Sequence, residues 1–87
     1  MLPHAAIERV ALQHARELSR CDGGETLRGE VTVQFSVDSA GKVSKAQVAT
    51  TLRKPSAASC VLRSVQAWQF PPPVEPGAVG TYTLSFP

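Results

Sequence analysis

The chain has 87 residues, a 43% apolar fraction and a formal net charge of +2, with nine basic and seven acidic residues. This length fits one small domain, expected over residues 1–87, and the apolar fraction is too high for a disordered chain. The basic residues are interleaved with acids and form no platform with aromatic residues, so the composition gives little support to nucleic-acid binding.

The first predicted element is an amphipathic helix over residues 4–20. Its apolar positions recur at three- and four-residue steps, and charged residues occupy the opposite face. Asp22-Gly23-Gly24 follows, where a glycine suits a left-handed helix cap. The apolar stripe consists of Ile7, Val10, Ala11, His14, Leu18 and Cys21.

A β-hairpin is predicted next. Residues 30–37 alternate apolar and polar side chains, which is typical of a half-buried strand. Asp38-Ser39-Ala40-Gly41 forms the turn. The second strand covers residues 42–52, and its apolar side chains change phase after Val43. A β-bulge near residues 44–45 would bring both phases to one face.

A second helix is expected to end at Gln69. Pro55 suits the first helical turn and Ser56 suits a helix cap. Phe70 precedes Pro71 and is therefore driven toward extended geometry, which stops the helix. The inward stripe of this helix consists of Cys60, Val61, Val65 and Trp68.

The chain leaves this helix through three prolines, Pro71, Pro72 and Pro73. They form either a rigid connector or a ligand for an aromatic groove, and we favour the connector because Phe70 flanks them. The last strand is expected over residues 81–86, with alternate side chains inward: Tyr82, Leu84 and Phe86.

The order α-β-β-α-β predicts the α+β class. A helical crossover favours a third strand parallel to the second, with right-handed sense. The first strand then fits between the other two, antiparallel to both, in the sheet order 2-1-3. Both helices are expected on one face of this sheet. Five aromatic residues are candidates for the layer between helices and sheet: Phe35, Trp68, Phe70, Tyr82 and Phe86.

Cys21 and Cys60 leave two interpretations open at this point. An even count in a small domain fits one disulfide in an oxidising compartment, and two separate buried thiols fit the spacing equally well. A zinc site with His14 and His4 is disfavoured, because the spacings match no standard finger or ribbon. No motif orients a nucleophile and a base. We expect no metal, no cofactor and no enzymatic activity.

Three patterns occur in order along the chain: Gly29-x-Val31-x-Val33-x-Phe35-x-Val37, then Gly41-x-Val43, then a helix followed by Trp68-x-Phe70-x-Pro72. This set resembles the C-terminal domain of TonB- and TolA-type proteins, over about Ile7 to Phe86. It looks closest to the branch at the end of AgmX/PglI gliding-motility proteins. That branch has one cysteine at the end of the first helix and another inside the second. Those positions are Cys21 and Cys60 here, and with both helices on one sheet face we expect a bridge between them.

The resemblance implies a non-enzymatic protein-interaction module in the periplasm of a Gram-negative bacterium. The full-length protein would be tethered to the inner membrane by a helix and linker outside this sequence. Through that part it would meet a motor driven by the proton-motive force. The domain itself would contact an outer-membrane or periplasmic protein segment, but neither nucleic acid nor the membrane. Relatives bind partner segments by adding them to the sheet as strands.

The order 2-1-3 leaves an open edge on both outer strands. The strand over residues 42–52 carries Lys42, Lys45 and the bulge, which discourage pairing. The last strand has no charge and no internal proline, so its backbone can accept another strand. The predicted partner-binding residues are Gly80, Thr81, Tyr82, Thr83, Leu84, Ser85 and Phe86.

Two other classes of function remain open. A structural dimerisation or anchoring domain would use the same edge on a second copy of the chain. A small periplasmic inhibitor or a cell-wall-binding domain is also compatible with the sequence. A concentration series by light scattering separates a dimerisation domain from a partner-binding module, which should stay monomeric at high concentration.

Overall fold

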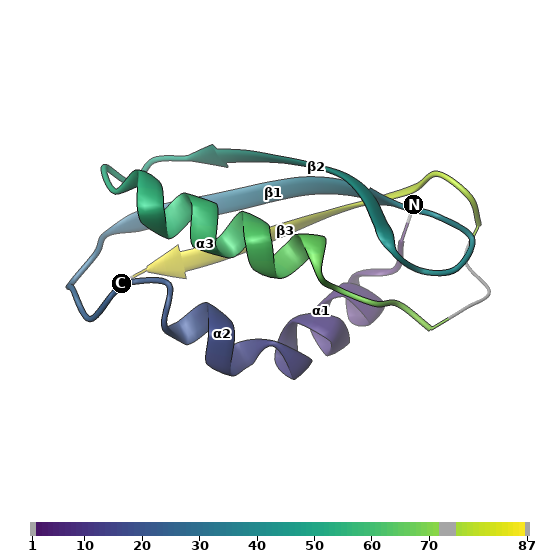
Figure 1. Ribbon diagram of the computed structural model, residues 1–87, viewed down its shortest axis with the longest axis horizontal. Helices are drawn as coiled ribbons and strands as arrows, with labels where there is room; N and C mark the ends of the chain where they lie inside the picture. The colour runs from purple at the N-terminus through teal and green to yellow at the C-terminus, as the bar shows by residue number, and fades with distance from the viewer. Residues whose placement is uncertain (1, 72–74, 87) are drawn as a thin grey trace.

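The computed structural model describes residues 2–71 and 75–86, so the predicted connector residues Pro72 and Pro73 lie outside it. In the described residues, β1 pairs antiparallel with both neighbours in the sheet order β2-β1-β3, so β2 and β3 run parallel. This confirms the predicted α+β class and sheet order. Figure 1 shows the elements, which are α1 (His4–Gln13), α2 (Ala15–Ser19), β1 (Gly29–Val37), β2 (Val43–Thr50), α3 (Pro55–Gln66) and β3 (Ala78–Phe86).

The hairpin of β1 and β2 contains the predicted bulge. Ser36 pairs with Lys45 and Val37 pairs with Val43, so Ser44 is the extra residue. The extra residue brings the two apolar phases of β2 to the same face, where the half-buried Val43 and Ala46 pack against the core.

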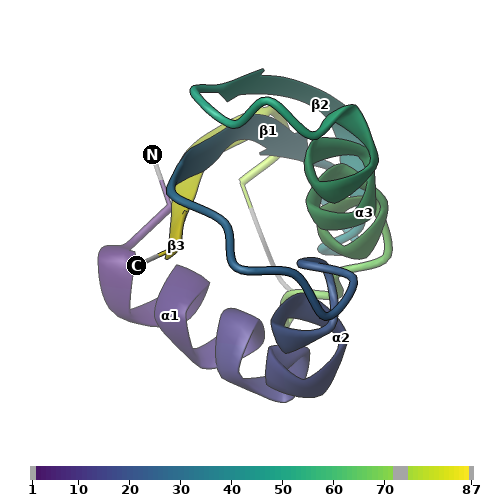
Figure 2. The ribbon, with the colours of Figure 1, turned by 90° about the vertical axis from the view of Figure 1, so that its left-hand side faces the viewer.

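The first helix is broken at His14, which corrects the expectation of one helix over residues 4–20. His14 has φ −109° and ψ 15°, outside helical geometry. Its ring contacts a Glu17 carboxylate oxygen through Nδ1 at 3.1 Å and lies 6.0 Å, centroid to centroid, from the Trp68 ring. Because of the break, the two halves of the apolar stripe pack on different elements. α1 packs on β3, and α2 packs on α3. Figure 2 shows all three helices on one side of the sheet, as predicted.

The second helix ends at Gln66, not at Gln69, and Ser56 lies inside its first turn instead of capping it. After the helix, the chain contacts the hairpin turn, where the Phe70 amide donates to the Gly41 carbonyl at 2.8 Å. Gly41 has φ +84°, and a Cβ there would lie 2.0 Å from the Phe70 carbonyl oxygen. Only glycine fits this turn, so Gly41 allows the segment after the helix to pack directly against the hairpin.

Four strand boundaries also differ from the prediction. The first strand begins at Gly29 and not at residue 30, and the second begins at Val43 and not at residue 42. The second strand ends at Thr50 and not at residue 52, because the Thr50 hydroxyl accepts from the Leu52 amide at 2.9 Å and turns the chain. The third strand begins at Ala78 and not at residue 81, because β1 is long enough to pair with it as far as Val37.

Trp68 lies at the centre of the layer between helices and sheet, with 1% of its surface exposed. Its ring centroid lies 5.9 Å from that of Phe35, 6.4 Å from that of Phe70 and 5.1 Å from that of Tyr82. Phe86 is half-buried at the margin of the same core. All five aromatic residues therefore belong to the predicted layer.

Candidate functional site

The outer edge of β3 is the candidate site. In the described part of the chain β3 has one strand neighbour, β1, and its other edge meets only the residue Leu2 by a backbone bond. The Leu2 amide donates to the Val79 carbonyl at 2.9 Å, so the backbone of Val79 points away from β1. Backbone groups of an antiparallel strand alternate between its two sides. The groups of Thr81, Thr83 and Ser85 therefore also point outward along the open edge.

The side chains of this strand alternate as predicted. Thr81, Thr83 and Ser85 are exposed on the face of the sheet opposite the helices. Tyr82 and Leu84 are half-buried on the helix-covered face. The open face therefore presents small polar side chains next to the unpaired edge, and none of them blocks the approach of another strand.

Gly80 differs from the other predicted site residues because it is buried. Its backbone groups are aimed at β1, like those of Tyr82 and Leu84. A Cβ at Gly80 would lie 2.9 Å from Phe35 Cζ, 3.0 Å from Ile7 Cδ1 and 3.1 Å from Leu2 Cδ1. The missing side chain is what allows Leu2 to pack over the sheet at this point. Sequence reasoning did not find Leu2, which precedes the periodic pattern of the first helix.

A hollow of about 210 Å³ lies between the helices and the later half of β3. We call it the Leu12 pocket. Leu12 is 74% exposed and lies outside the buried stripe of its helix. The pocket is lined by Glu8, Ala11, Leu12, Ala15, Leu18, Ser19, Tyr82 and Leu84. The one signal for it in the sequence is Leu12 itself, an apolar residue away from the stripe.

Tyr82 joins the pocket to the core. One side of its ring packs against Trp68, and the residue is also part of the pocket lining. Burial raises the pKa of the Tyr82 hydroxyl, and the nearby Glu8 carboxylate adds to the effect. The phenol is therefore neutral across the physiological range.

The edge of β2 has a different character. Lys45 and the bulge at Ser44 lie on it, as predicted, and α3 packs along this strand. Val48 is 37% exposed on the helix side. Charge and a bulge both oppose edge pairing, so β3 is the edge better suited to accept a strand.

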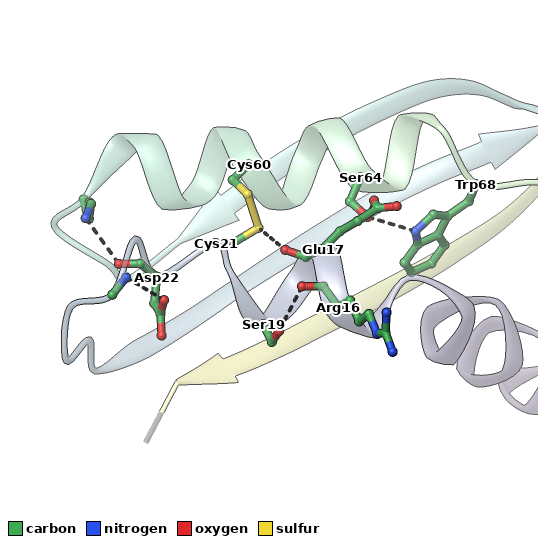
Figure 3. Close-up of a disulfide and its surroundings, with 10 residues drawn as sticks. Arg16, Glu17, Ser19, Cys21, Asp22, Cys60, Ser64 and Trp68 are labelled. Atoms are coloured by element: carbon green, nitrogen blue, oxygen red, sulfur yellow. Dashed lines mark hydrogen bonds between the residues drawn. A yellow bond between two sulfur atoms is a disulfide. The ribbon is translucent and has the colours of Figure 1, made fainter.

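A disulfide joins Cys21 and Cys60, which confirms the predicted bridge (Figure 3). It fixes the end of the α2 segment to the middle of α3. Beside it, Trp68 Nε1 donates to Ser64 Oγ at 3.3 Å, and Ser64 Oγ donates to a Glu17 carboxylate oxygen at 3.1 Å. The covalent bond and this chain of hydrogen bonds hold the N-terminal helices against the core.

The residues considered for a zinc site, Cys21, Cys60, His4 and His14, do not form one in the described part of the chain. The two cysteine sulfurs are bonded to each other, and in residues 2–71 and 75–86 no three His, Cys, Asp or Glu side chains are grouped to hold a metal. His4 contacts Glu8 within α1, and His14, at the break, contacts Glu17 of α2. Within the same residues, no helix is both long enough and apolar enough to cross a membrane.

Comparison with known protein families matches residues 25–87 to the family described as Gram-negative bacterial TonB protein C-terminal. The chain belongs to the TonB C-terminal family. Domains of this family are periplasmic, interact with other envelope proteins and are not catalytic. No curated protein and no solved structure matches the chain. The match does not distinguish the AgmX/PglI branch from other TonB C-terminal domains.

The family match covers the sheet and α3, and α1 and α2 lie before it. The Cys21–Cys60 disulfide connects these two parts of the chain. In this TonB C-terminal domain, the helices outside the match line one side of the Leu12 pocket, with Tyr82 and Leu84 of β3 on the other.

Proposed function

We propose that this domain binds an extended segment of an outer-membrane or periplasmic protein as an added strand along residues 80–86. The domain would thereby act as the protein-interaction module of an envelope-spanning complex that transduces energy or drives motility. The observation that carries the proposal is the open, uncharged edge of β3, whose outward backbone groups belong to Thr81, Thr83 and Ser85.

In the proposed binding mode, the predicted site residues of β3 have two different roles. Thr81, Thr83 and Ser85 would supply backbone donors and acceptors to the partner. Tyr82 and Leu84 bond to β1 through their backbone and would meet the partner only through their side chains. Main-chain hydrogen bonds would give affinity, and the side chains beside the edge would give selectivity.

The wider assignment rests on the resemblance to the AgmX/PglI branch. We propose that the full-length protein is tethered to the inner membrane and reaches a proton-motive-force-driven motor there, with gliding motility as the process served. The Cys21–Cys60 disulfide is compatible with the oxidising periplasm that this proposal requires.

The same edge supports a second candidate, a structural dimerisation domain. A second copy of the chain could pair with β3, because small uncharged side chains do not discourage edge-to-edge contact. Light scattering over a concentration series separates the two candidates. A monomer at high concentration supports the partner-binding module, and a dimer that dissociates when Thr83 is replaced by proline supports dimerisation.

Chemical-shift mapping with a candidate partner peptide tests the proposed function. The largest amide shifts are expected at residues 80–86, with smaller shifts in β1. If the largest shifts fall on α3 or on residues 42–48, strand addition at β3 is wrong.

A further inference from the structure

Leu2 occupies the first position of the open β3 edge in the way that a residue of an added strand would. Its amide donates to the outward carbonyl of Val79 at 2.9 Å, as a residue of an added strand would. Its side chain is buried and lies with Ile7 over Gly80, between α1 and the sheet. The chain itself therefore pairs with the first position of the edge and inserts an apolar side chain behind it.

The next positions along the edge have no such occupant in the described residues. The Leu12 pocket lies there, on the same side of the sheet as Leu2, with Tyr82 and Leu84 on its β3 side. Since side chains of a strand alternate between faces, every second residue of an added strand would point toward α1 at this point. A residue opposite Tyr82 or Leu84 would thus enter the pocket.

We propose that the Leu12 pocket takes a large apolar side chain of the bound segment and so selects the partner. This inference rests on the proposed strand addition and specifies its ligand. The ligand is an extended segment of another protein, with an aliphatic or aromatic residue on its inward side and a lysine or arginine near it. The pocket volume of about 210 Å³ has room for one such side chain.

Two features of the lining support this choice of ligand. Leu12, Ala11, Ala15 and Leu18 offer an apolar wall, and the exposed Leu12 would lose its contact with water when covered. Glu8 is the charged residue of the lining, and its pairing with His4, at 3.7 Å, is exposed to solvent. A basic residue on the partner would complement Glu8, and an acidic one would be repelled.

Two synthetic decapeptide probes test the inference. The first has threonine at its outward positions, leucine at two inward positions and lysine at a third. The second is identical except that serine replaces both leucines. Each is titrated into the oxidised protein, with backbone amide shifts as the readout. We expect the leucine probe to bind at least about tenfold more tightly, the factor that a difference of about 1.4 kcal/mol produces.

Matched protein variants locate the effect. Leu12→Asp should remove most of the preference for leucine, and Gln13→Asp, on the same helix but not in the pocket lining, should leave it unchanged. Both positions are exposed, so neither variant should lower the melting temperature appreciably. Glu8→Lys reverses the charge of the lining, so this variant should bind a leucine probe with glutamate in place of lysine more tightly than the original leucine probe.

The outcomes separate this inference from the proposed function. If both probes shift residues 80–86 with equal affinity, the pocket does not select the partner, although strand addition stands. If the leucine preference survives Leu12→Asp, the selecting surface is elsewhere and the inference is wrong. If neither probe shifts residues 80–86, both the inference and the proposed strand addition are contradicted.

Discussion

The Cα atoms of Cys21 and Cys60 lie 5.4 Å apart, joined by a disulfide that spans 39 positions of sequence. The bond connects the N-terminal helices to the part of the chain that matches the TonB C-terminal family. Because α1 lines the candidate site, the position of one wall of that site depends on this covalent link.

Removal of the disulfide should destabilise the domain strongly. Closing a loop of this length contributes about 4 kcal/mol in the chain-entropy model, a large share of the stability of a small domain. Cys60→Ser combined with Cys21→Ser should therefore lower the free energy of unfolding by that order in urea denaturation. Mass spectrometry after alkylation without reductant is the control, and two alkylated thiols in the native protein would show that the bond is absent.

Trp68→Ala should be among the most destabilising single truncations, at about 3–5 kcal/mol, because it empties the centre of the helix–sheet layer. Leu12→Ala serves as the matched control, since Leu12 is largely exposed and its loss should change stability little. Thermal denaturation of both variants gives the comparison. A melting temperature within one or two degrees of wild type for Trp68→Ala would contradict the packing described.

Much of the fold follows from the sequence because the patterns there are local. Alternation in residues 30–37 and the phase change after Val43 predict the hairpin and its bulge. At the break, the ring of His14 lies beside that of Trp68, a contact between distant parts of the chain that no local pattern indicates. Beyond the end of α3 at Gln66, Phe70 bonds to Gly41, and this contact also joins segments far apart in the sequence.

The candidate edge is predictable for the same reason, since charge and strand composition can be read directly. Which residues of β3 point their backbone groups outward cannot be predicted from the sequence. That depends on the register of β3 with β1, and the bond from Leu2 to Val79 reveals it. The Leu12 pocket is a tertiary feature, lined by residues of α1, α2 and β3. Its one signal in the sequence is that Leu12 is apolar but lies outside the apolar stripe of its helix.

Acid should weaken the contact between α2 and α3. Hydrogen bonding from His14, aided by Ser64, holds the pKa of Glu17 below its ordinary value of 4.5. A carboxyl with a lowered pKa in the folded state stabilises the fold above that ordinary value, and the contribution is lost as pH falls through the folded-state pKa. Melting temperatures of wild type and Glu17→Gln should therefore differ at pH 6 and converge below pH 4.5. A constant difference down to pH 2 would contradict this role.

Two proline substitutions test the parity of the edge. Thr83→Pro removes an outward amide and should weaken partner binding while the protein stays folded, because proline is tolerated on an open edge. Leu84→Pro removes an amide that faces β1 and should unfold the domain. Circular dichroism and peptide titration of both variants give the result. Equal loss of structure in the two would mean that the assigned parity is wrong.

Amide hydrogen exchange in β3, with and without a bound partner segment, tests the central claim of strand addition most directly. The outward amides of Thr81, Thr83 and Ser85 should exchange quickly in the free protein and slow markedly when the segment binds. The amides of Tyr82 and Leu84 are already bonded to β1 and should change little. This alternating protection is what the account predicts. Uniform protection along β3, or new protection confined to β2 or the helices, would contradict it.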